Sequence, residues 1–294
     1  MKKDFIRFNT REYNPKHKLT VFLIAYNHEN TIRDTIESIL TQKQNCKHNF
    51  IVKILEDCST DNTLKICQEY ARKYPDLFEL FAQPKNTHCE HIKTALINNL
   101  DTPYWCFIEG DDYYTDSAFF DKAIDFFEKH PDYNLFAGKH KLNTLNNEFT
   151  NTFKNQLFEP NKDLSLDNYV YCQTSARIYR NIFDFANMQE YPFIYDMYLY
   201  VLYLYVGKSH FYNKFVSVYR QTITGSWTQL NDKQQKLAGR AVVKKLISFY
   251  GFGPATMFVK LYPKRTMQRL NRVFGAKITI RIIKIYESIF GKNL

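Results

Sequence analysis

Hydrophobic runs alternate with amphipathic segments through about the first 130 residues of this chain. Leu19–Ala25 is continuously apolar and rich in β-branched side chains, which predicts a strand buried on both faces. Behind it, hydrophobic residues recur at helical spacing: Ile32, Ile36, Ile39 and Leu40. We expect further strands at Ile51–Leu55, Leu77–Phe81 and Tyr104–Ile108, and helices near residues 64–71, 91–100 and 116–128.

This alternation predicts an α/β fold, with a mostly parallel sheet flanked by helices. In such sheets, ligands bind beyond the carboxyl ends of the strands. Neither a GxGxxG turn nor a GxxxxGK[ST] loop is present in the sequence. The absence of both argues against a dinucleotide site and against a P-loop.

The pattern is mixed beyond Gly138. Residues 143–163 are polar and predict loops, whereas residues 169–179 and 210–219 predict extended segments. A helix is expected from about Tyr195 to Val206. From about Asn231 onward, the chain is expected to be mainly helical.

Positive charge is concentrated near the end of the 294 residues, which carry a formal net charge of +10. Residues 230–294 contain 14 Lys or Arg and 2 Asp or Glu. Within them, residues 277–290 (KITIRIIKIYESIF) place isoleucines on one helical face and cations on another, which favours contact with an anionic membrane surface. The alternative is a helix packed on its own domain. Isoleucines, not stacking aromatics, accompany the cations, which argues against nucleic acid as a partner.

The cysteines and the apolar runs indicate where in the cell the protein is located. The six cysteines form no CxxC pair, and several lie in apolar runs, which is typical of buried thiols. Met1–Lys18 is polar and charged, unlike a signal peptide, and the longest apolar run, Tyr198–Val206, is too short to span a bilayer. We therefore expect a cytoplasmic protein without a membrane span.

Carboxylates follow two of the predicted strands. Glu109, Asp111 and Asp112 end one of them, and carboxylate oxygens are ligands that magnesium and manganese prefer beside substrate phosphates. A metal held there would neutralise a diphosphate leaving group. Alternatively, Asp111 and Asp112, with Asp116, cap the following helix. Asp57, after another strand, fits either a contact with a base or ribose, or a turn.

Five segments, in order between residues 19 and 220, resemble the motifs of family 2 glycosyltransferases. LTVFLIAYNHENTIRDTIESILTQ resembles the opening of that family, and ILEDCSTDNT its second-strand signature. FIEGDDYYTD resembles its DxD-type metal motif, in the subgroup with EGDDYW. CQTSARIYR resembles the TSS-x-x-FR segment on the acceptor side, and YDMYLYVLYLYVGKSHFYNKFVSVYR resembles the closing stretch. The resemblance implies a GT-A fold and a nucleotide-sugar donor.

The resemblance also implies roles for particular residues. Asp57 matches the aspartate that contacts the base, Asp111 is the first metal ligand with Asp112 in support, and the metal is Mn²⁺ or Mg²⁺. Asp196 matches the general base that acts on the acceptor hydroxyl. The residues predicted to bind the nucleotide-sugar are Ala25, Tyr26, Asn27, Glu29, Asp57, Glu109, Gly110, Asp111, Arg220 and Trp227.

The segment that follows the last motif contributes Arg220 and Trp227, in YRQTITGSW. An arginine there can engage phosphate in a bidentate manner, or it can form an ion pair within the protein. Two positions depart from the subgroup pattern. Thr222 stands where members often carry a histidine near the metal, and Glu109 stands in place of the more usual aspartate.

Together these observations predict an inverting glycosyltransferase that moves a sugar, with UDP-sugar the favoured donor, onto a hydroxyl group. The expected acceptor is a lipid-linked or cell-surface glycan, such as lipopolysaccharide or capsule. The alternative is a non-catalytic protein of the same fold that binds a nucleotide-sugar or glycan.

We expect a catalytic domain over residues 1–229, with a nucleotide-sugar half at 18–138 and an acceptor half at 139–229. Residues 230–294 would form a basic, mainly helical extension. Its part from 260 to 294 is expected to contact the inner face of the cytoplasmic membrane.

Overall fold

The computed structural model describes residues 13, 16–87, 90–146, 148–151, 159, 162–165, 168, 170–187, 196–222 and 231. Apart from Asn231, all of them belong to one compact unit, Asp4–Lys154 with Phe158–Gln229. Trp227, the amphipathic segment 277–290 and nearly all of the predicted extension lie outside the described residues. The division into domains and the membrane-contact segment therefore stay predictions.

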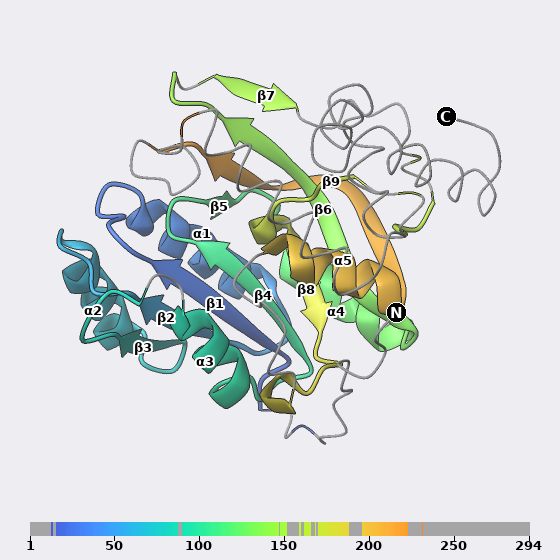
Figure 1. The fold of residues 1–294 in the computed structure, drawn as a ribbon, viewed down its shortest axis with the longest axis horizontal. Helices are drawn as coiled ribbons and strands as arrows, with labels where there is room; N and C mark the ends of the chain where they lie inside the picture. Colours follow the sequence, from blue (N-terminus) through green and yellow to red (C-terminus); the bar gives the residue numbers. More distant parts are fainter. Residues whose placement is uncertain are drawn as a thin grey trace, which may run out of the picture. The chain divides into compact units, whose positions relative to one another are not determined.

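The first half of the unit is the expected parallel sheet. Its strands are β1 (Leu19–Ala25), β2 (Phe50–Glu56), β3 (Phe78–Ala82) and β4 (Tyr104–Glu109), and its helices are α1 (Ile32–Asn45), α2 (Thr63–Lys73) and α3 (Glu90–Asn98). The four strands are parallel in the order β3-β2-β1-β4 and lie side by side in Figure 1. Each lies within about two residues of its predicted position, the usual uncertainty of element ends.

The second half adds antiparallel and parallel pairs to the same sheet. Its elements are β5 (Tyr113–Tyr114), α4 (Phe119–Lys129), β6 (Tyr133–Asn143), β7 (Phe149–Asn151), β8 (Arg177–Arg180), α5 (Asp196–Val206) and β9 (Lys208–Arg220), with short 3₁₀ turns η2 (Thr174–Ala176) and η3 (Phe185–Asn187). The strand order is β3-β2-β1-β4-β8-β6-β9-β5, and β7 pairs with β6. β8 runs antiparallel to both neighbours, whereas β6 and β9 are parallel.

Three expectations for this half need correction. β6 was not predicted, because only its first half is apolar and buried while Lys139–Asn143 is mostly polar. The predicted loop region 143–163 contains β7, which pairs with the polar end of β6. The predicted extended segment 169–179 is interrupted by η2, and β8 begins only at Arg177.

Helices cover both faces of the sheet. Alternate residues of β1 pack in one core cluster with side chains of α1, α2 and α4, among them Ile36, Ile66 and Phe120. On the other face, Trp105 of β4 stacks on Tyr179 of β8 and contacts Tyr203 of α5 edge-on. Among the described residues, no helix has both the length and the apolar character needed to cross a bilayer.

Arg180, at the end of β8, closes the carboxyl end of α4. Its guanidinium donates to the backbone carbonyls of Phe127 and Tyr133 at 2.8 Å each and of His130 at 3.1 Å. The last carbonyls of a helix lack partners within the helix, so a cation there supplies both hydrogen bonds and favourable charge. This arginine of the CQTSARIYR motif therefore has a structural role in the described part of the chain.

Candidate functional site

The loop after β1 is tied to the loop after β2. Asn27 adopts a left-handed conformation with φ 54°, and its Oδ1 accepts a hydrogen bond from the Thr60 amide at 2.8 Å. The Glu29 carboxylate accepts from the amide and side-chain nitrogens of Asn62 at 3.1 and 2.8 Å. Both side chains were predicted to bind the nucleotide-sugar. In the structure they join two loops, and their contact with a donor stays a prediction.

Glu56 ends β2 and Asp57 follows it. The sequence left a turn or a contact with a base or ribose open for Asp57, and the structure gives the turn to Glu56. Glu56 is fully buried and accepts the amide N–H groups of Cys58 and Ser59 at 3.2 and 2.7 Å, so the turn depends on Glu56. Asp57 is also buried, and its Oδ1 accepts from the amide and the hydroxyl of Thr87 at 2.8 Å each. These bonds fix the Asp57 carboxylate at the end of β2, where a contact with a base is still a prediction.

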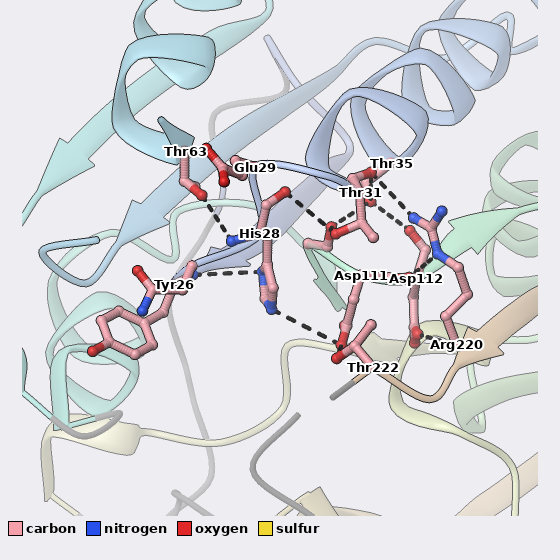
Figure 2. A network of polar contacts seen from close by, with 12 residues as sticks. Tyr26, His28, Glu29, Thr31, Thr35, Thr63, Asp111, Asp112, Arg220 and Thr222 are labelled. Carbon is pink, nitrogen blue, oxygen red and sulfur yellow. Dashed lines mark hydrogen bonds and ion pairs between the residues drawn. The ribbon is translucent and has the colours of Figure 1, made fainter. Parts of the chain in front are cut away.

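Tyr26 is an exposed aromatic residue at the carboxyl end of β1. Its relative exposure is 39%, whereas the preceding Ala25 is fully buried in the core. The phenol ring lies away from the pair formed by His28 and Asp111 (Figure 2). An exposed ring at this edge of a parallel sheet offers a flat apolar face where ligands of such sheets bind.

The turn after β4 passes close to α1, and only a glycine fits there. A Cβ atom on Gly110 would lie 2.5 Å from His28 Nδ1 and 2.7 Å from Ile32 Cδ1. The Gly110 carbonyl accepts from the hydroxyls of Thr31 and Thr35 at 2.9 and 3.0 Å. Close packing and these two bonds therefore fix the turn that carries the acidic residues.

Asp112 points into the protein. It is fully buried, its Oδ2 accepts from the Ser175 hydroxyl at 2.9 Å, and its Oδ1 accepts from the Arg220 amide at 3.1 Å. Burial is the main cause that raises the pKa of Asp112 well above its ordinary value, and the negative charges of Asp111 and Glu109 raise it further. With both oxygens bonded to η2 and to the end of β9, Asp112 joins distant segments. Its supporting role toward a metal stays a prediction.

Asp111 points the other way, toward the loop after β1. Only 5% of the residue is exposed, and its Oδ1 accepts no hydrogen bond from any residue that the structure describes. Its Oδ2 lies 3.3 Å from Thr222 Oγ1 and 3.9 Å from His28 Nε2 (Figure 2). A buried carboxylate oxygen without a partner is costly, and a divalent cation would satisfy it. The residue therefore fits the metal-ligand role predicted for it.

His28 was not among the predicted site residues, although Asn27 and Glu29 on either side of it were. Its side chain is 14% exposed, and its backbone amide donates to Thr63 Oγ1 at 2.7 Å. Burial lowers the pKa of His28, and the carboxylates of Asp111 and Asp61 oppose that shift. Only the packing of the loop after β1 against the turn after β4 brings this imidazole to Asp111.

Arg220 is engaged within the protein. Its NH1 lies 2.7 Å from the Asp34 carboxylate, its NH2 donates to the Thr31 carbonyl at 3.1 Å, and its Nε donates to the Asp111 carbonyl. The guanidinium also lies over the Tyr113 ring. These contacts favour the ion pair that the sequence left open for Arg220, and a bond to phosphate stays a prediction.

The remaining candidates have less defined surroundings. Glu109 ends β4 and is partly exposed. α5 begins at Asp196, but the side chain of Asp196 lies outside the described residues, as does all of Trp227.

Capping is wrong as an explanation for Asp111 and Asp112, because α4 begins only at Phe119. Asp116 lies closer and accepts from the amide of Ala118 at 3.1 Å, but this bond belongs to the turn before the helix, since Ala118 is the N-cap of α4 and no side chain caps that helix among the described residues.

The sheet explains how these residues meet. Asp111 follows β4, His28 follows the adjacent parallel β1, and Thr222 follows β9, which reaches the same place because β5 pairs with β9. Carboxyl ends of parallel strands share one edge, so the site lies where α/β folds bind ligands. A buried carboxylate beside an imidazole and a hydroxyl can hold a cation and a phosphate group together.

The chain is similar to known proteins in sequence and in fold. A sequence model of glycosyl transferase family 2 matches residues 20–185. An uncharacterized protein of Mycobacterium tuberculosis is 26% identical over 215 residues, covering 71% of this chain and 60% of that protein. The minor teichoic acid biosynthesis protein GgaB of Bacillus subtilis is 26% identical over 152 residues, covering 49% of this chain and 16% of that protein. The chain thus matches less than two thirds of the length of either relative.

A solved structure shares the fold. Staphylococcus aureus TarS 1–349 in complex with UDP-GlcNAc aligns with a TM-score of 0.57 at 18% identity, over 78% of this chain and 66% of that chain. The mixed sheet with helices on both faces is that of GT-A proteins. Because the family match covers more than half of the sequence, the chain belongs to glycosyl transferase family 2. The predicted fold class and family are confirmed.

Proposed function

We propose that this protein is an inverting glycosyltransferase that transfers a sugar from a nucleotide-sugar, with UDP as the favoured nucleotide, to a hydroxyl group of a cell-surface polymer. The observation that carries the proposal is the buried Oδ1 of Asp111, which has no hydrogen-bond partner among the described residues, at the carboxyl ends of β1 and β4. TarS, which has the same fold, was solved with UDP-GlcNAc, and GgaB is named for teichoic acid biosynthesis.

Each side chain has a distinct part in the proposed donor site. Asp111 would hold Mn²⁺ or Mg²⁺, which when bound neutralises the charge of a diphosphate leaving group. The exposed ring of Tyr26 would cover one face of the base, and the fixed carboxylate of Asp57 would accept from its edge. Asp112 and Arg220 would hold the turn in place through the contacts described above.

The proposed reaction is a single displacement. The acceptor oxygen attacks the anomeric carbon as the bond to the diphosphate breaks on the opposite face, and Asp196 takes the hydroxyl proton. Such a base contributes about 10²–10⁴-fold to the rate. Asp196 at the first position of α5 would be held in a fixed place by the helix start.

The proposed acceptor is supported by the names of the relatives, and the proposed location by the basic segment near the end of the sequence. A teichoic acid or another surface polymer carries free hydroxyl groups that can accept a sugar. The basic segment 260–294 would keep the enzyme on anionic lipid at the cytoplasmic face. The sugar transferred would be a hexose or an N-acetylhexosamine.

The test is binding and hydrolysis of a panel of nucleotide-sugars by the full chain, with and without Mn²⁺. We expect one donor to bind in a Mn²⁺-dependent manner and the dependence to be lost in Asp111→Ala. Asp132→Ala is the matched control, since this aspartate is exposed and paired with Lys208. Asp196→Asn should keep donor binding and lower transfer by about 10²-fold or more. A folded protein that binds no donor would refute the proposal.

A further inference from the structure

The imidazole of His28 is held rigidly beside the proposed donor site. Its backbone carbonyl accepts from the amides of Thr31 and Ile32 at 2.9 and 2.8 Å, at the start of α1, and its amide is bonded to Thr63. The ring packs against Gly110, where even a methyl group would lie 2.5 Å from Nδ1. The backbone of His28 is therefore held by three hydrogen bonds and its ring lies against Gly110, with Nε2 directed toward Asp111 (Figure 2).

The contact of Nδ1 assigns the tautomer of the neutral His28 ring. Nδ1 faces the amide N–H of Tyr26 at 3.5 Å, a long contact that a proton on Nδ1 would turn into a repulsion between two donors. Nδ1 is therefore the acceptor, and the neutral ring carries its proton on Nε2. A metal-binding nitrogen must have a free lone pair, and metal-binding histidines usually donate through the other nitrogen. The arrangement at His28 is the reverse.

The proton on Nε2 has no hydrogen-bond acceptor among the described residues. Asp111 Oδ2 is 3.9 Å away, beyond hydrogen-bond distance, and it also faces the Thr222 hydroxyl. The neighbouring cation, Arg220, is engaged with Asp34 and with two backbone carbonyls. His28 thus offers a fixed, unused donor next to the carboxylate proposed to hold the metal.

We propose that His28 donates a hydrogen bond from Nε2 to the outer phosphate of the nucleoside diphosphate, and so stabilises the leaving group. The inference rests on the proposed function and adds a residue to it. As the bond from the anomeric carbon to the phosphate oxygen breaks, its electron pair goes to the diphosphate. The acceptor oxygen forms the new bond, and its proton goes to Asp196. His28 keeps its own proton and acts as a fixed donor where charge develops.

Two substitutions separate the donor role from a role in packing. The amide nitrogen of glutamine can reach the place of Nε2, whereas the shorter asparagine ends near the place of Nδ1. We would measure the affinity of the full chain for UDP and for UMP, which lacks the outer phosphate, in Mn²⁺. His28→Asn is expected to weaken UDP binding about tenfold or more and to leave UMP binding nearly unchanged, because the lost bond has a charged acceptor. His28→Gln should restore most of the UDP affinity.

His48→Asn is the matched control. His48 lies among Asp121 and Asp125, a cluster that can itself attract Mn²⁺, and the substitution should leave both nucleotide affinities unchanged. Equal losses for UDP and UMP in His28→Asn would overturn the inference in favour of a packing role. A drop in Mn²⁺ affinity without nucleotide, not rescued by glutamine, would overturn it in favour of metal ligation. If the wild-type chain binds neither UDP nor any other nucleoside diphosphate, the proposed function itself fails.

Discussion

His140 is a buried histidine in the middle of the sheet, and its titration should limit stability in acid. It lies in β6, it is 3% exposed, and its Nδ1 accepts from the amide of Gln173 at 3.2 Å. Burial, with a smaller contribution from the charge of Arg177, lowers the pKa of His140 from 6.5 to about 4. The folded protein therefore holds this ring in its neutral form.

The sign and size of the effect follow from linkage. Below pH 6.5 the unfolded chain binds a proton at His140 and the folded chain does not, so stability falls as the pH falls toward 4. Between pH 7.5 and pH 5.0, this difference lowers the free energy of unfolding by about 2 kcal/mol. The variant His140→Asn keeps an acceptor near the position of Nδ1 and cannot titrate.

Urea denaturation at pH 7.5 and pH 5.0 measures the effect as a difference between variants. The smaller asparagine side chain makes His140→Asn less stable than wild type at both pH values. On acidification, however, the free energy of unfolding should fall by about 2 kcal/mol more in wild type than in His140→Asn. The control is His130→Asn, since His130 is exposed at the end of α4. Equal losses of stability in wild type and in His140→Asn would refute the reasoning.

Three further predictions concern stability. Gly110→Ala should cost about 1–3 kcal/mol in chemical denaturation and displace His28 or Ile32, since the new methyl group overlaps both; an unchanged midpoint would contradict this. Arg180→Met should lower the free energy of unfolding by about 2 kcal/mol, because three backbone carbonyls around the end of α4 lose their donor. Amide hydrogen exchange should increase first at that end of the helix. Asp112→Ala should cost about 1–3 kcal/mol by removing the acceptor of the Arg220 amide and leaving the Ser175 hydroxyl with Ser217 alone, whereas Asp112→Asn should cost much less; equal losses of stability would argue against those bonds.

Local patterns determined the first half of the fold. Leu19–Ala25 is a strand over the predicted residues because a strand buried on both faces needs a continuous apolar run. The helix beginning at Ile32 follows from apolar side chains spaced to form one face. β6 was missed because its second half is polar, and the backbone pairing with β9 that stabilises it depends on residues far along the chain.

The motifs pointed to the carboxyl ends of β1 and β4, but they did not show which way each side chain points. Asp111 and Asp112 are neighbours of the same type, and only the resemblance to the DxD-type motif ranked Asp111 before Asp112 as a metal ligand. Tertiary structure distinguishes them, because Ser175 and the Arg220 amide bind Asp112 inside the protein, while Asp111 faces His28. Side-chain direction at a turn depends on what packs against it, and those partners come from distant parts of the chain. His28, Asp111 and Thr222 meet only because β1, β4 and β9 end at one edge of the sheet.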